Sequence, residues 1–133
     1  YSTGFFRNKA KAIIGLAAAL VAKHQGVVPD TLEDLVALPG VGRKTANVVL
    51  SVWFHRPAIP VDTHVQRLVG RLGLTKETDP VKIEMALQRL LPQEDWSFTA
   101  TALIGHGRRV CFARNPGCTA CALRPDCPFP ARR

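Results

Sequence analysis

The feature that most constrains this chain is a group of four cysteines near its C-terminal end, with no cysteine elsewhere. They follow the pattern C-x6-C-x2-C-x5-C within residues 111–127, a stretch that also contains one glycine, two prolines and two arginines. A segment so poor in apolar side chains has no core of its own, so we expect a bound metal or cluster to order it. The four residues are Cys111, Cys118, Cys121 and Cys127.

Three chemistries compete for these cysteines. Disulfides are disfavoured, because nothing in the sequence indicates secretion into an oxidising compartment. Zinc sites usually take their ligands from two separated CxxC pairs, whereas only Cys118 and Cys121 form such a pair here. A compact loop of four cysteines suits an iron–sulfur cluster better. The residues alone therefore favour a cluster and leave zinc as the alternative.

The net charge of the chain limits the kinds of molecule that it is expected to bind. The chain of 133 residues carries 18 Lys and Arg against 10 Asp and Glu, a net charge of +8. The excess lies mostly at the two ends: the first 25 residues contain no acid, and Asp126 is the only acid from Gly105 onward. Such a protein most often meets a polyanion, and nucleic acid is the leading candidate. The alternative is a basic surface that serves only solubility.

No stretch of the sequence predicts a membrane span or a signal peptide. The longest apolar run, residues 12–22, is too short to cross a bilayer and ends at Lys23. The sequence opens on Tyr1 rather than on methionine, directly before a helical pattern. We therefore expect a piece of a longer polypeptide, or a processed product.

Hydrophobic periodicity predicts helices throughout, and hence an all-α fold. Predicted caps and stops support the boundaries: Asp30 or Thr31 begins one helix, Asp62 another, and Asp79 with Pro80 a third. The run 58–61 is too short and too close to prolines to build a sheet. We expect both Trp53 and Trp96 to fill the core. The predicted helices cover about residues 5–23, 31–38, 43–54, 63–72, 80–90 and 96–105.

Two glycines shape the turn between the second and third predicted helices. Glycine tolerates backbone conformations that a Cβ forbids and lets the main chain approach a ligand closely. The helix that follows directs its free N–H groups and its positive dipole end toward the same turn, which suits a DNA phosphate. An ordinary helix corner is the alternative. The candidate DNA-binding residues of this hairpin are Leu38, Gly40, Val41, Gly42, Arg43 and Thr45.

Three motifs together resemble one family. The runs LPGVGRKTANVVL, VDTH and HGRRVC, followed by the four-cysteine pattern, look like endonuclease III, a helix-hairpin-helix DNA glycosylase and lyase of base-excision repair. The resemblance extends over nearly the whole chain and implies two helical lobes that grip DNA across a cleft. Residues 1–56 would form the later part of a six-helix lobe, with the hairpin at about 31–54. Residues 57–133 would form the iron–sulfur lobe, with the cluster loop at 111–127.

The resemblance also assigns the site residues. It makes Lys44 the nucleophile, Asp62 its partner across the cleft, and all four cysteines the ligands of a [4Fe-4S] cluster. His64 also matches the family and is a candidate DNA contact. Without the resemblance, Lys44 is better explained as a phosphate-binding lysine and Asp62 as a helix cap. For His106, a structural hydrogen bond is the favoured role.

The chemistry explains why a lysine and a carboxylate are needed together. Breaking an N-glycosidic bond builds positive charge on the sugar, which a carboxylate stabilises. The lysine amine must lose its proton before it attacks the sugar, and the target base must first leave the stack. The resulting Schiff base allows β-elimination, which cuts the strand. Asp62 is therefore expected to handle protons and to stabilise charge.

The resemblance implies double-stranded DNA with a damaged base or an abasic site as partner, and oxidised pyrimidines as the bases removed. We expect a monomer, without membrane contact, in the cytoplasm near the nucleoid if the source is bacterial. One alternative is a mismatch-adenine-type glycosylase, which has serine where this chain has Lys44. The other is a helix-hairpin-helix module that binds DNA without chemistry.

Overall fold

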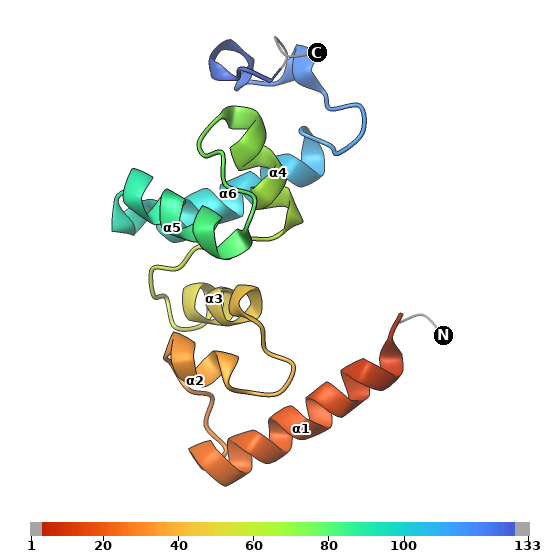
Figure 1. Cartoon of the computed structure of the whole chain (residues 1–133), viewed down its shortest axis with the longest axis vertical. Helices are drawn as coiled ribbons and strands as arrows, with labels where there is room; N and C mark the ends of the chain where they lie inside the picture. The colour runs from red at the N-terminus through yellow and green to blue at the C-terminus, as the bar shows by residue number, and fades with distance from the viewer. Residues whose placement is uncertain (1–3, 130–133) are drawn as a thin grey trace. The chain divides into compact units, whose positions relative to one another are not determined.

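The computed structural model describes residues 4–129, and no β-strand occurs in that part of the chain (Figure 1). This confirms the predicted all-α fold class. The α-helices are α1 (Phe6–His24), α2 (Leu32–Val36), α3 (Arg43–Val52), α4 (Thr63–Leu72), α5 (Pro80–Leu90) and α6 (Trp96–Arg109). Short 3-10 helices follow at η1 (Gln93–Asp95), η2 (Cys118–Ala120) and η3 (Arg124–Asp126).

The described residues divide into two compact units. The first ends at Arg56 and contains α1 to α3, and the second begins at Pro57 and contains the remaining helices. None of the described helices combines the length and the apolar character that a membrane span requires.

In the first unit, α2 and α3 form a helical hairpin. Thr31 caps α2: its hydroxyl accepts a hydrogen bond from the Asp34 amide at 3.2 Å and donates one to the Asp34 carboxylate at 2.8 Å. Thr31 is one of the two residues that the sequence predicts at the start of this helix. Leu35, Leu38, Ala46 and Leu50 are the buried apolar residues of this pair.

The second unit has a continuous core built by α4, α5, α6 and the extended segment that leads into α4. α4 packs against α6 (Figure 1), and a Cβ on Gly107 would lie 3.0 Å from the His64 Cβ. The absence of a side chain at Gly107 therefore permits the close approach of the two helices. The buried core residues are Ile59, Val61, Val65, Leu68, Val69, Ile83, Leu87, Ala100 and Leu103.

Two details differ from the sequence-based expectation. α6 continues past Gly105 to Arg109, because packing against α4 outweighs the weak helix propensity of its two late glycines. Trp96 packs against the core and donates its indole N–H to the Leu91 carbonyl, as expected of a buried tryptophan. Trp53 is 74% exposed, so the prediction that it fills the core is wrong.

We predict that Gly40→Ala destabilises the hairpin. Gly40 has φ +74°, and a Cβ there would lie 2.6 Å from the Ala12 Cβ of α1. Backbone strain and overpacking together should lower the free energy of unfolding by about 2 to 4 kcal/mol. Chemical denaturation of the full-length protein, followed by circular dichroism, measures this loss.

Gly42→Ala is the matched control within the same turn. Gly42 has φ −88°, and a Cβ there would meet nothing within 4 Å. It should change the free energy of unfolding by about 1 kcal/mol or less. Equal losses in the two variants would contradict the role given to Gly40.

Candidate active site and metal centre

The hairpin turn leads directly into an uncapped helix. Gly42 is the N-cap of α3, and no side chain among the described residues caps the helix. The first turn of α3 contains no acidic residue. An uncapped N-terminus with its positive dipole end is a suitable place for an anion.

The candidate hairpin residues differ in their access to solvent. Gly40, Gly42, Arg43 and Thr45 are exposed, and Val41 is half-buried. Leu38 is only 5% exposed, and its carbonyl accepts a hydrogen bond from the Val41 amide at 3.1 Å. The Leu38 side chain therefore anchors the turn in the hairpin core.

Lys44 is the second residue of α3, and its side chain is exposed. Its ammonium group forms no hydrogen bond or ion pair with any residue of 4–129. A lysine next to an uncapped helix start can serve two roles. It can bind a phosphate, or its amine can react with a group on the bound ligand.

Asp62 is the N-cap of α4, in the second unit. Its Oδ1 accepts hydrogen bonds from the amides of His64 and Val65, both at 2.9 Å. The capping interpretation of Asp62 is thus confirmed. Within the described part of the chain its Oδ2 accepts no hydrogen bond, and the residue is half-buried. The second oxygen therefore remains available to a ligand.

His64 contacts a residue that the sequence did not single out. Its Nδ1 lies 3.0 Å from Nη2 of Arg67. The same Nη2 also contacts the carbonyls of Gly107 and Cys111, so His64 lies beside the hydrogen bonds that join α4 to the end of α6. His64 is half-buried and therefore keeps partial access to solvent.

Arg67 connects α4 to the end of α6 and to the first cysteine. Its Nη2 donates to the carbonyls of Gly107 at 2.9 Å and Cys111 at 3.0 Å, and its Nε donates to the Cys111 carbonyl at 3.2 Å. The available signal was a pair of arginines, Arg67 and Arg71, four residues apart on one amphipathic helix. Sequence reasoning did not use this signal.

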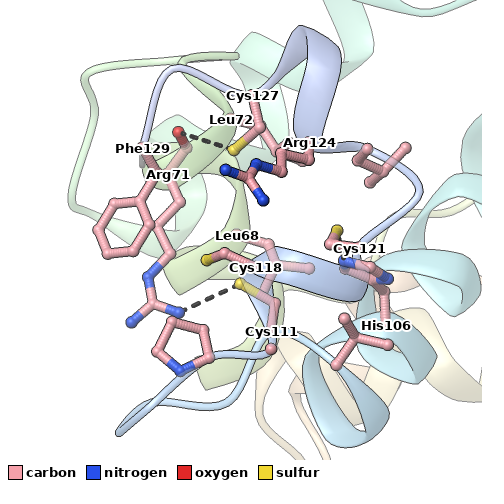
Figure 2. A pocket seen from close by; sticks show the side chains of 14 residues that line it. Leu68, Arg71, Leu72, His106, Cys111, Cys118, Cys121, Arg124, Cys127 and Phe129 are labelled. Atoms are coloured by element: carbon pink, nitrogen blue, oxygen red, sulfur yellow. Dashed lines mark hydrogen bonds between the residues drawn. The ribbon is translucent and has the colours of Figure 1, made fainter. Parts of the chain in front are cut away.

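The four cysteines line one cavity, and none of the four forms a disulfide. Figure 2 shows their side chains around the same space, with Leu68 and His106 also on its walls. The cavity contains about 400 Å³ of empty space, including its open mouth. His106 Nε2 lies 3.5 Å from the Cys121 sulfur, in keeping with the hydrogen-bonding role expected for it.

The donor set of the cavity fits a cluster of soft metal ions. Four thiols converge on it, and its remaining lining is apolar apart from His106 and two arginines, Arg71 and Arg124. Cationic neighbours offset the negative charge that four thiolates bring to a cluster. In residues 4–129, no three His, Cys, Asp or Glu side chains are arranged around a point that would suit a single metal ion.

Comparison with known proteins places this arrangement in context. Residues 23–52 match the model of the helix-hairpin-helix motif. The chain is 54% identical to endonuclease III of a Synechocystis strain over 129 residues, which is 96% of this chain and 59% of the relative. Endonuclease III of Thermotoga maritima is 47% identical over 98% of this chain and 62% of its own length. Over nearly its whole length, this chain is similar to endonuclease III. It spans about three fifths of the length of these relatives.

Solved structures of endonuclease III show the same similarity in three dimensions. The structure of a non-covalent endonuclease III–DNA complex aligns with 98% of the present chain and with 61% of the endonuclease III chain, with TM-score 0.93 and 44% identity. The structure of a trapped endonuclease III–DNA covalent intermediate aligns with 99% of the present chain and with 62% of the endonuclease III chain, with TM-score 0.94 and 45% identity. A thermostable thymine-DNA glycosylase shares the fold at 23% identity, with TM-score 0.83.

We predict that replacements of Asp62 separate the effect of its capping hydrogen bonds on stability from the effect of its charge. Asp62→Ala removes both capping hydrogen bonds and should lower the free energy of unfolding by about 0.5 to 2 kcal/mol. Asp62→Asn keeps a capping oxygen and should stay within a few tenths of a kcal/mol of the parent. Thermal and chemical denaturation of the full-length protein test both values. A loss with Asn as large as that with Ala would show that the charge, rather than the cap, stabilises α4.

Proposed function

We propose that this chain carries the catalytic residues of a base-excision-repair DNA glycosylase with an associated abasic-site lyase activity. One observation carries the proposal: Lys44 is exposed and unpaired among the described residues, one residue into the uncapped helix of a helix-hairpin-helix. A phosphate bound at that helix start would bring the sugar–phosphate backbone close to the amine. The match to a trapped covalent endonuclease III–DNA intermediate supports it further.

DNA binding rests on main-chain donors and on cations. The hairpin offers the amides of the first turn of α3, with Arg43 and Thr45 exposed beside them. Arg108 and Arg109 are exposed in the last turn of α6. Contacts of this kind hold the backbone of double-stranded DNA without reading its sequence. Selection of the damaged base then depends on extruding it from the stack.

The proposed reaction proceeds by covalent catalysis. The deprotonated amine of Lys44 forms a bond to C1′ as the glycosidic bond breaks, and the base leaves with the electron pair of that bond. The Asp62 carboxylate stabilises the positive charge on the sugar and accepts or returns protons. The sugar ring then opens to a Schiff base. Loss of a C2′ proton expels the 3′ phosphate, and hydrolysis of the imine releases the enzyme.

The four cysteines are proposed to hold a [4Fe-4S] cluster. Its role here is structural, because the loop over residues 111–127 contains few apolar side chains that could order it. The loop then displays its arginines, among them the exposed Arg114 and Arg124, to DNA phosphates. In this scheme residues 57–133 form an iron–sulfur lobe and residues 1–56 the hairpin-bearing part of a helical lobe.

Substrate class and cellular setting follow from the same homology. The proposed substrates are oxidised pyrimidines and the abasic sites that remain after their removal. The protein is proposed to act as a monomer and, in a bacterium, in the cytoplasm with the nucleoid DNA. A mismatch-adenine-type glycosylase is less well supported because Lys44 stands where those enzymes have serine.

We predict that Lys44 variants of the full-length protein lose strand cleavage but keep most DNA binding. Lys44→Arg preserves the positive charge but offers no amine that can form a Schiff base, so nicking of an abasic-site duplex should fall at least about 100-fold. Lys44→Ala should do the same and weaken binding slightly through one lost phosphate contact. Gel assays of nicking and fluorescence anisotropy measure the two effects.

Lys82→Ala is the control, since Lys82 is an exposed lysine on α5. It should nick at the parental rate. If Lys44→Arg nicked as fast as the parent, the lyase assignment would fail and a DNA-binding module would be the better description.

We also predict iron and acid-labile sulfide in equal amounts, about four of each per chain, in the anaerobically purified full-length protein. Cys118→Ser should lower both together and remove the visible absorption of the cluster, because it deletes one thiolate ligand. Elemental analysis and absorption spectroscopy provide the readout. Stoichiometric zinc without sulfide would contradict the cluster assignment.

A further inference from the structure

Arg71, in the last turn of α4, makes an unusual set of contacts with the cysteine segment. Its Nη1 donates to the Cys111 sulfur at 3.1 Å and to the Phe112 carbonyl at 2.7 Å, and its Nη2 donates to the Ala113 carbonyl at 3.0 Å. Its guanidinium carbon lies 4.4 Å from the centre of the Phe129 ring. Figure 2 shows Arg71 between Cys111 and Phe129 on the wall of the cavity.

These contacts divide the cysteine segment between two arginines one helical turn apart. Arg67 holds the carbonyl of Cys111, whereas Arg71 holds its sulfur and the two carbonyls that follow. An arginine in the last turn of a helix commonly serves the helix's own terminal carbonyls. Arg71 instead donates to a segment forty residues away, so α4 fixes the chain at the point where it enters the cavity.

The opposite side of the cavity also reaches Arg71. The Cys127 thiol lies 3.9 Å from the Arg71 carbonyl oxygen, and the ring of Pro128 would meet a Cβ on Gly73 at 3.5 Å. The C-terminal end of α4 therefore contacts the chain near the first and the last cysteine of the pattern. One end of α4 thus contacts two of the four proposed ligands.

We infer that Arg71 is a positioning residue for the cluster proposed above: it holds Cys111 in place and sets a positive charge against that cysteine's sulfur. The inference rests on the proposed assignment of the four cysteines. The sulfur atom in the structure stands in for the thiolate that would bind iron. Arginine suits this place because its planar fork spans several acceptors at once and stays charged.

Two consequences follow from charge and geometry. A cation that hydrogen-bonds a ligating sulfur stabilises the state of the cluster with more negative charge, so it raises the reduction potential. Removal of a residue that orients a metal ligand typically lowers metal affinity by roughly 10- to 100-fold. A residue that served only to pack the loop would change cluster retention without shifting the potential.

The test compares three variants of the full-length protein, each loaded with iron and sulfide. Arg71→Met removes the charge and the donors, whereas Arg71→Lys keeps the charge but not the fork. Arg89→Met is the matched control, because Arg89 also lies in the last turn of a helix, α5, and lines no part of the cysteine cavity. The readouts are the midpoint potential at an electrode and the rate of iron release to a chelator.

We expect a lower midpoint potential and at least tenfold faster iron release for Arg71→Met. Arg71→Lys should keep a potential near that of the parent while releasing iron faster, and the control should match the parent in both. A parental potential in a cluster-loaded Arg71→Met protein would overturn the inference. If that variant took up no cluster, Arg71→Lys would decide: parental iron release from it would also overturn the inference.

The same experiment separates this inference from the proposed function. A parent protein without iron and sulfide would remove the cluster assignment and the role of Arg71 together. Nicking by Lys44 is measured independently, so the lyase proposal would survive that result. A loaded parent with unaltered variants would leave the cluster in place and remove only the role of Arg71.

Discussion

The start of α4, in the second unit, depends on the pair of hydrogen bonds that Asp62 accepts from the amides of His64 and Val65. They fix the start of a helix whose buried face, with Val65, Leu68 and Val69, lies in the core of the unit. The same helix holds the cysteine segment at its other end through Arg71. A carboxylate with proposed chemistry and a proposed metal centre therefore lie at opposite ends of one rigid element.

The first unit depends on a different feature: the two glycines in the turn between α2 and α3, which have no side chains. Gly40 adopts a positive φ and lies against Ala12, where any Cβ would collide. Gly42 leaves the start of α3 open, and Lys44 follows within the first turn. The proposed anion site and the proposed reactive amine therefore occupy adjacent positions of the chain. This adjacency supports the proposed lyase chemistry. The similarity to a trapped endonuclease III–DNA covalent intermediate supports it as well.

Local patterns predicted most of the fold. Helix caps at Thr31, Asp62 and Asp79 depend on neighbours two or three residues away, so the sequence contains the full signal. Exposure and long-range contacts depend on tertiary packing, which periodicity does not encode. The core role expected of Trp53 was therefore wrong, and the partners of Arg67, about forty residues distant, were missed. The roles of Lys44, Asp62 and the cysteines came from family resemblance and stay predictions.

The central claim is that the amine of Lys44 forms a covalent bond to the sugar of the damaged nucleotide. The most direct measurement is borohydride reduction of the full-length protein on a duplex with one abasic site, followed by mass spectrometry of the digested adduct. We predict one modified peptide, with the sugar remnant on Lys44. A remnant on another amine, or no adduct from protein that binds the duplex, would contradict the claim.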